Sequence, residues 1–262
     1  MKLNIVPAGT GIQWVKLGIR TFMRQPLALT ALFFLYIAAA SLLWLVPILG
    51  PLLGAAVVPA ATLGFMAATQ EAVNGNVPTP MVFLGAFRAG RARVKAMLVL
   101  GLMYAVLWIG ILLLVGVLVD LPTDAVTPDA QHPPSPAYVN AMLLAFAMYV
   151  PVSLMFWHAP ALVHWHGISP LKSLFFSSVA CVRNWKAMIV FNLAWLVLII
   201  AFGTIISTVS MLTGSGQLSV GIAMPLALLV AAVFSTSLFF TFRDSFVPDE
   251  PTPEPPTSGD SP

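Results

Sequence analysis

The chain has 262 residues, of which 59% are hydrophobic and 8% are Asp, Glu, Lys or Arg, whereas soluble domains carry about 25% charged residues. With a mean hydropathy of +0.95, this composition excludes a water-soluble globular protein and predicts a polytopic membrane protein. The single cysteine, Cys181, excludes an intramolecular disulfide and a cysteine-based metal site within one chain.

Six apolar segments are long enough to cross a bilayer, because about 20 helical residues span its hydrocarbon core. They lie near residues 27–49, 51–70, 97–119, 138–163, 187–209 and 218–242. Proline and glycine between Pro47 and Pro51 interrupt the first long apolar stretch. We therefore expect a tight hairpin there, with one kinked helix as the alternative. The predicted fold is an all-α polytopic helix bundle with a single membrane domain over residues 1–245.

All twelve Lys and Arg residues fall in segments on one side of these spans, and the opposite connections, 47–51, 120–137 and 210–217, contain none. By the positive-inside rule we expect both termini to be cytoplasmic. Topology thus accounts for the pI near 9.2, and no nucleic-acid partner is expected. The tail over residues 246–262 is rich in Pro, Asp and Glu, and we expect it to be disordered.

A basic amphipathic segment precedes each pair of spans. The first has apolar residues at helical spacing, Ile12, Val15, Ile19 and Phe22, and a basic stripe of Lys16, Arg20 and Arg24. The second has Phe83, Phe87 and Val94 near one face and Arg88, Arg91 and Lys95 on another. The third opens at Ser169-Pro170 and has an apolar side of Leu171, Leu174, Phe175, Val179 and Val182. We predict three cytoplasmic interfacial helices, the first two with basic stripes that contact anionic lipid headgroups.

The chain also shows signs of internal repetition. The pentapeptide from Lys95 to Val99, KAMLV, is nearly the same as KAMIV from Lys186 to Val190, at the equivalent point of the next unit. This indicates three units, at about 8–70, 80–163 and 169–242, each an interfacial helix followed by a hairpin of two spans. A shared requirement of the membrane interface is the alternative explanation.

Three histidines, His158, His164 and His166, lie within nine residues. A metal site would need the helix to break after Pro160, and no carboxylate accompanies the rings to orient them. We therefore expect interfacial anchoring, with no metal and no cofactor. His158 is the only ionisable side chain well inside a span, so it is a candidate for a substrate pathway together with two polar residues of the same span, Asn140 and Tyr149.

No paired carboxylates, metal-ligand set or nucleophile with a base is visible, so we expect no enzymatic activity. The leading hypothesis is a non-enzymatic membrane scaffold or lipid-organising protein, with anionic membrane lipids as partners. The alternative is a permease or flippase for a lipophilic or amphipathic substrate. A cavity lined by His158, Asn140 and Tyr149 would favour the permease, and a solid bundle the scaffold. The sequence does not predict whether the protein forms a homo-oligomer or binds a protein partner.

Several stretches carry a resemblance to a known family: Ile5-Val6-Pro7-Ala8, Arg24 to Leu29, Trp165 to Ser177 and Arg183-Asn184-Trp185. They resemble an uncharacterised family of betaproteobacterial multi-pass inner-membrane proteins. The resemblance implies a location in the bacterial inner membrane and carries no activity, substrate or cofactor. In unit design the chain is more loosely similar to the membrane domain of glycerophosphodiester phosphodiesterases, but no catalytic residue carries over.

Overall fold

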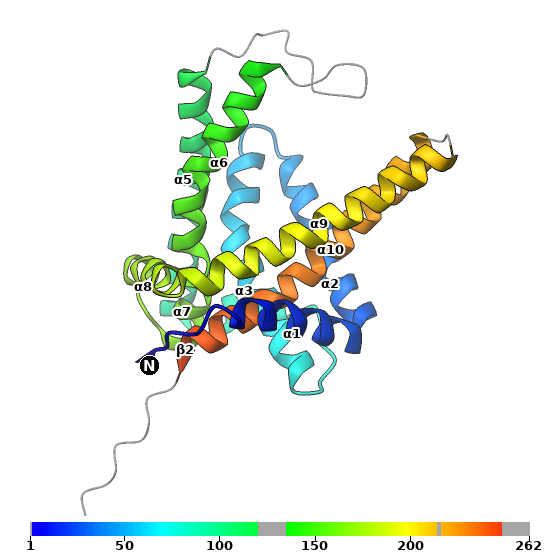
Figure 1. Cartoon of the computed structure of the whole chain (residues 1–262). Helices are drawn as coiled ribbons and strands as arrows, with labels where there is room; N and C mark the ends of the chain where they lie inside the picture. Colours follow the sequence, from blue (N-terminus) through cyan, green and yellow to red (C-terminus); the bar gives the residue numbers. More distant parts are fainter. Residues whose placement is uncertain (1, 120–134, 214–215, 248–262) are drawn as a thin grey trace, which may run out of the picture.

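The computed structural model describes residues 2–119, 135–213 and 216–247, and of residues 216–220 only the backbone. Ten helices and two short strands make up this described part of the chain (Figure 1). They follow one another as β1 (Lys2–Leu3), α1 (Thr10–Arg24), α2 (Pro26–Trp44), α3 (Gly50–Val73), α4 (Met81–Arg88), α5 (Arg91–Leu118), α6 (Pro136–Phe156), α7 (Ala159–His166), α8 (Pro170–Arg183), α9 (Trp185–Thr213), α10 (Gly216–Ser245) and β2 (Phe246–Val247).

Six candidate membrane spans are present in the described residues: α2, α3, α5, the segment formed by α6 and α7, α9 and α10. They confirm the all-α polytopic bundle predicted from hydropathy. The residues between α2 and α3 form a turn, in which Ile48 adopts a positive φ of 64°. The predicted hairpin is therefore correct and the kinked helix is not. Gly54 lets the two helices approach, since a Cβ there would lie 2.4 Å from Nε1 of Trp44.

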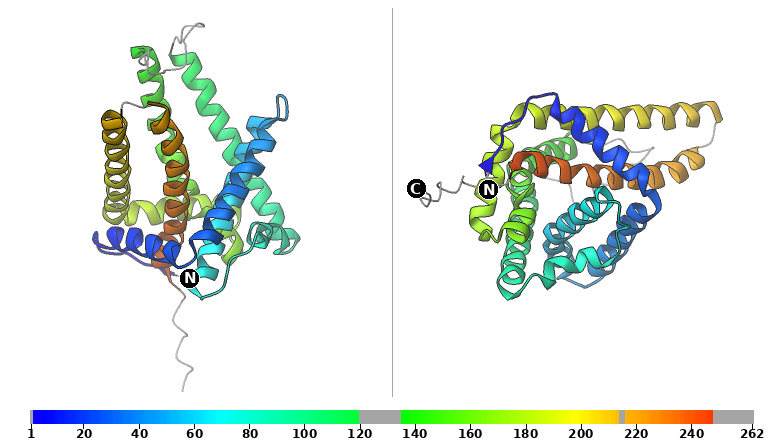
Figure 2. Two further views of the ribbon diagram at one scale, coloured as in Figure 1. Left: turned by 90° about the vertical axis from the view of Figure 1, so that its right-hand side faces the viewer. Right: turned by 90° about the horizontal axis from the view of Figure 1, so that it is seen from below.

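Three hairpins, α2–α3, α5–α6 and α9–α10, rise from a layer of short helices at one end of the molecule (Figures 1 and 2). Helix α3 is the central one: 61% of its most apolar window is buried inside the protein, against 11% for α9. It packs against α2, α5, α7 and α10. In the other spans at most 33% of the most apolar window is buried inside the protein, which leaves apolar surface for contact with lipid tails.

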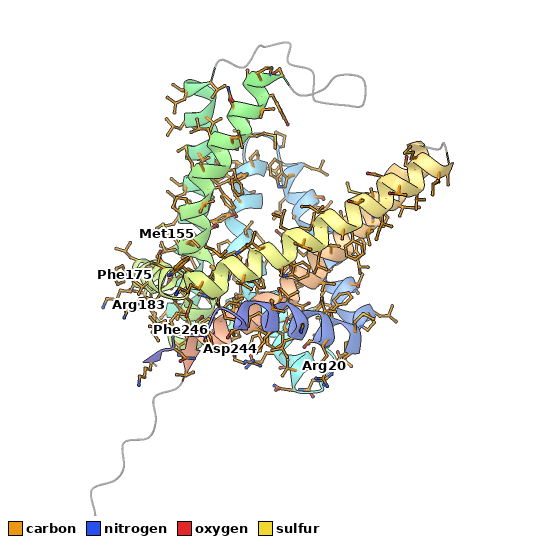
Figure 3. All side chains as sticks on the ribbon, in the orientation of Figure 1. Arg20, Met155, Phe175, Arg183, Asp244 and Phe246 are labelled. Atoms are coloured by element: carbon orange, nitrogen blue, oxygen red, sulfur yellow. The ribbon has the colours of Figure 1, made fainter. Side chains whose placement is uncertain are left out.

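All twelve bases lie at the end of the bundle that carries the short helices, which we call the basic end. They belong to β1, α1, α4 and α8, to the first turns of α5 and α9, and to the last turn of α10. Figure 3 shows two of them, Arg20 of α1 and Arg183 of α8, at this end. The hairpin α9–α10 leans away from α5–α6 as it leaves the basic end (Figure 1).

The two ends of the described chain meet in a clasp. Strand β1 pairs antiparallel with β2, with Lys2 opposite Val247 and Leu3 opposite Phe246. The side chain of Asn184, 2% exposed, holds both segments. Its Oδ1 accepts from the Val6 N–H at 2.9 Å, and its Nδ2 donates to the Asn4 carbonyl at 3.0 Å and to Ser245 Oγ at 3.3 Å.

This clasp corrects the predicted start of the tail. Residue 246 was expected to begin a disordered segment, but Phe246 is 7% exposed and packs in the core with Phe242 at a ring-centroid distance of 5.3 Å. The apolar side chain finds a buried position, so the chain stays in the fold through β2. The rest of the predicted tail, 248–262, lies outside the described residues, as does most of the predicted connection 120–137.

Candidate lipid surface and intramembrane cavity

Helix α1 lies across α9 and α10 at the basic end, and glycines on its inner side permit the close contact. A Cβ on Gly11 would lie 2.3 Å from the Ala187 carbonyl oxygen, and one on Gly18 would lie 2.5 Å from the Cβ of Ser237. Between them Trp14 is fully buried and donates its indole N–H to Asp244 Oδ2 at 2.9 Å. This helix is therefore an integral part of the bundle as well as an interfacial segment.

The outer side of α1 carries two adjacent strips. Lys16, Arg20 and Arg24 are exposed, as predicted for a basic stripe. The predicted apolar stripe is wrong in one respect, because it divides between two surroundings. Val15 and Phe22 are buried in the bundle, whereas Ile12 and Ile19 are exposed and stand beside Met23, which is 67% exposed. Because successive residues are rotated by about 100°, going around the helix one meets first the side buried in the protein core, then the exposed apolar strip, and then the bases.

Helix α8 repeats this order in the same rotational sense. Its buried side includes Ser173, Leu174, Ser177, Ala180 and Cys181. Next around the helix come Leu171, Phe175 and Val182, which are 72%, 64% and 59% exposed. The bases Lys172 and Arg183 follow, about a quarter of a turn further on. Of the predicted apolar side only Leu174 is buried in the bundle.

Helix α4 is shorter and shows the same order, from buried Ala86 through exposed Phe87 and Leu84 to Arg88. The predicted stripe of Arg88, Arg91 and Lys95 is wrong, because these residues do not share a helix. The chain turns at Gly90, whose φ of 92° breaks the helix, and Arg91 and Lys95 lie in the first turns of α5. All three bases are exposed at the basic end.

The structure separates the three residues of the predicted substrate pathway. Asn140 is exposed in the first half of α6, far from the basic end. His158 is fully buried between α6 and α7, where its backbone N–H donates to Ser177 Oγ at 2.9 Å. Its ring packs against Phe242 and Phe246, with centroids 5.9 and 5.6 Å away. The helix breaks at Trp157 and His158, before Pro160 and not after it, and the described residues hold no group of three metal-ligating side chains.

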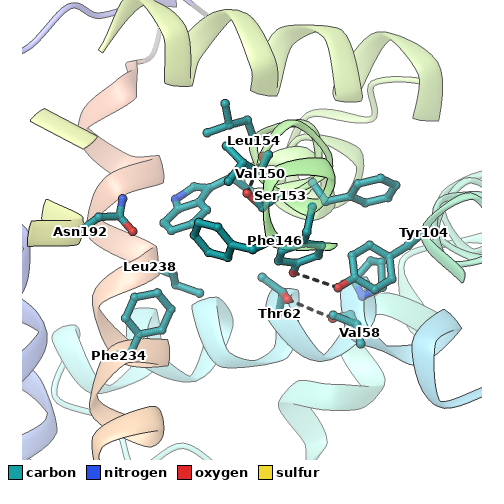
Figure 4. Close-up of a pocket in the computed structure, with 14 residues that line it drawn as sticks. Val58, Thr62, Tyr104, Phe146, Val150, Ser153, Leu154, Asn192, Phe234 and Leu238 are labelled. Carbon is teal, nitrogen blue, oxygen red and sulfur yellow. Dashed lines mark hydrogen bonds between the residues drawn. The ribbon is translucent and has the colours of Figure 1, made fainter. Parts of the chain in front are cut away.

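Tyr149 lines a cavity of about 520 Å³ between the hairpins, which we call the central cavity (Figure 4). Helices α3, α5, α6, α9 and α10 contribute its walls. The lining consists of Val58, Pro59, Thr62, Tyr104, Phe146, Tyr149, Val150, Ser153, Leu154, Phe156, Trp157, Asn192, Phe234 and Leu238. The hydroxyl oxygens of Tyr104 and Tyr149 lie 3.1 Å apart. His158 and Asn140 are not among the lining residues.

Sequence reasoning found Tyr149 and missed its partners Tyr104, Thr62 and Asn192. Each of these three residues is a polar side chain inside an apolar span, which the sequence shows. The sequence of one span does not show which other span will pack against that side chain. Among the described residues, Asn192 does not hydrogen-bond to another helix through its amide nitrogen. Instead its Nδ2 donates to the Met188 carbonyl of its own helix at 2.8 Å.

Six apolar spans with lipid-exposed faces and a layer of basic helices at one end define a multi-pass integral membrane protein. The chain is 34% identical, over 271 residues, to a probable inner membrane protein of Burkholderia thailandensis, and the match covers 99% of this chain and 100% of that protein. The chain therefore belongs to the family of this inner membrane protein, which confirms the resemblance described above. No protein-family model and no solved structure matches it.

Proposed function

We propose that this inner-membrane protein is a non-enzymatic lipid-organising protein with both termini in the cytoplasm. The observation that carries the proposal is the common order of surfaces on α1, α4 and α8. Each helix buries one side in the bundle and then presents an exposed apolar strip followed by bases. A helix with these three neighbours fits the membrane interface, where protein, acyl chains and headgroups meet.

The charge on these helices favours anionic lipids. Each Lys or Arg near an anionic surface contributes about 1 kcal/mol of attraction. The exposed bases of α1 sit beside an apolar strip that reaches the acyl region, so a headgroup phosphate and its chains can contact one helix together. The location of every Lys and Arg at the basic end supports a cytoplasmic position of that end.

The test uses the full-length protein with Lys16, Arg20 and Arg24 all replaced by Gln. Native mass spectrometry from micelles containing equal phosphatidylglycerol and phosphatidylcholine counts the lipids that stay bound. We expect the ratio of phosphatidylglycerol to phosphatidylcholine to fall in the triple variant, more strongly at low salt, because the screened surface attraction is removed. The matched control, Lys16→Arg with Arg20→Lys and Arg24→Lys, retains the charges and should keep the native ratio. An unchanged ratio in the Gln variant rules the proposal out.

The central cavity favours a second candidate, a permease or flippase for a lipophilic or amphipathic substrate. It contains Tyr149 of the predicted pathway and lies between hairpins that diverge. Transport of a fluorescent phospholipid across proteoliposomes, faster than in protein-free vesicles, would support this candidate. Binding without transport supports the lipid-organising protein.

A further inference from the structure

We infer that the central cavity binds one uncharged lipid through hydroxyl or carbonyl oxygens of its polar part. This inference rests on the proposed lipid-organising function and names a second, neutral class of ligand for a site away from the basic helices. Its basis is the convergence of five polar side chains from four membrane-spanning helices on one largely apolar cavity: Thr62, Tyr104, Tyr149, Ser153 and Asn192.

None of the described residues that line the cavity is Asp, Glu, Lys, Arg or His. A phosphate placed there would be a buried charge without a counter-ion, which is strongly unfavourable. The cavity therefore selects against phospholipid headgroups and against the anionic lipids that suit the basic helices. An uncharged polar group enters without this penalty.

The hydrogen-bonding capacity of the lining matches oxygen-bearing groups. In the Tyr104–Tyr149 pair one hydroxyl proton lies between the two oxygens, and the other is available to a ligand. Thr62 and Ser153 donate to the carbonyls of Val58 and Val150, at 2.9 and 2.7 Å, so their oxygens remain as acceptors. Figure 4 shows Tyr104 and Thr62 among the side chains drawn around this space. The cavity thus presents at least one donor and several acceptors to a bound molecule.

The remaining walls fit an apolar body. Phe146, Phe156, Trp157 and Phe234 line the cavity, and about 520 Å³ falls within the range of small-molecule sites. Phe234 also lines a second groove, of about 530 Å³, between α9 and α10. That groove includes Trp195, which is 4% exposed and whose indole N–H has no partner among the described residues. A lipid whose chain continues past Phe234 would offer an ester or carbonyl oxygen to this donor.

The chain contains a matched set of tyrosines for the test. The double variant Tyr104→Phe with Tyr149→Phe removes two hydroxyl groups from the cavity and leaves both rings. Tyr36→Phe with Tyr138→Phe makes the same chemical change outside the cavity, since neither residue lines it. A third variant, Ser153→Phe, fills the cavity.

Native mass spectrometry of the full-length protein, titrated separately with dioctanoylglycerol and decylubiquinone, measures binding of two uncharged carbonyl-bearing probes. We expect one molecule of at least one probe per chain, and whichever binds identifies the source of the carbonyl. The cavity tyrosine variant should bind it about tenfold more weakly, the control tyrosine variant should bind it like the native protein, and Ser153→Phe should lose it. If Ser153→Phe does not fold, the two tyrosine variants decide the question.

Three results would overturn the inference. The first is that neither probe binds saturably, and the second is that both tyrosine variants lose probe binding equally. The third is that phosphatidylglycerol binding also requires Tyr104 and Tyr149. The proposed function is tested with the α1 variants and a charged lipid, so its outcome does not depend on the outcome for the central cavity. Loss of phosphatidylglycerol selectivity in the Lys16, Arg20 and Arg24 variant, with unchanged binding of the neutral probe, would show that the two sites are independent.

Discussion

Replacing Asn184 by Ala should open the clasp between the two ends of the chain. The Asn184 side chain makes three hydrogen bonds at 2.9, 3.0 and 3.3 Å, to Val6, Asn4 and Ser245. Since it is 2% exposed, water cannot easily replace them. The alanine variant leaves the Val6 N–H and the Asn4 carbonyl without these partners.

Each lost hydrogen bond costs about 1 kcal/mol, and buried groups left unpaired cost at least as much. The variant should therefore lower the free energy of opening the clasp by about 3 kcal/mol. Because every 1.4 kcal/mol is a factor of ten, the open population should rise about 150-fold.

The single cysteine reports this opening. Cys181 lies three residues before Asn184 and is 2% exposed, and burial raises the pKa of its thiol to about 12. At pH 8 a maleimide reacts with it only when the surrounding helices separate. We expect maleimide labelling of the Asn184→Ala protein in detergent to be about 150-fold faster than labelling of the native protein.

Asn140→Ala is the matched control, because Asn140 is exposed and far from Cys181 along the bundle. It should label at the native rate. Equal labelling rates for Asn184→Ala and Asn140→Ala would refute the reasoning, since Asn184 would then hold nothing that limits access to Cys181. A uniformly faster rate in both would indicate general destabilisation and would equally contradict it.

Three further outcomes follow from the described contacts. Gly101→Ala should lower the thermal unfolding midpoint, because its Cβ would lie 2.3 Å from the Ala56 carbonyl oxygen and overpacking costs about 1–3 kcal/mol; Gly110→Ala, with nothing within 4 Å, should leave the midpoint unchanged. Trp14→Phe removes the hydrogen bond to Asp244 and should raise the rate of Cys181 labelling roughly tenfold. In a Cys181→Ser background, a cysteine at position 129 should react with an impermeant maleimide added to the periplasmic side, and labelling only from the cytoplasm would contradict the topology.

The spans could be predicted because hydropathy is a local property that a bilayer turns into helices. The hairpin at Pro47 to Pro51 was predictable for a similar reason, since forty apolar residues exceed one membrane thickness. Predicting that the second basic stripe is divided between two helices required one more local observation. Gly90 adopts a φ that other residues rarely take, and a glycine two residues after Arg88 already marks a possible helix end.

Helix geometry explains why the three candidate pathway residues do not line one cavity. Asn140, Tyr149 and His158 are spaced by nine residues, and nine residues rotate a helix by about half a turn and advance it by roughly 13 Å. Neighbouring members of the set therefore point to opposite sides, and the outer two lie near opposite ends of the span. The tyrosine pair across α5 and α6 and the clasp around Asn184 join distant parts of the chain, which no local pattern identifies.

The position of α1 has a consequence for the biogenesis of the protein. This helix leaves the ribosome before α9 and α10, on which its buried side mainly packs. Until those two helices are made, Trp14 lacks both Phe191, against which its ring packs, and Asp244, to which its indole N–H donates. With its apolar strip beside a row of bases, the nascent helix can bind at the membrane surface until α9 and α10 are inserted. Because β1 pairs with β2, which follows every described span, we expect a chain truncated before Phe246 to insert its spans and to lack the clasp.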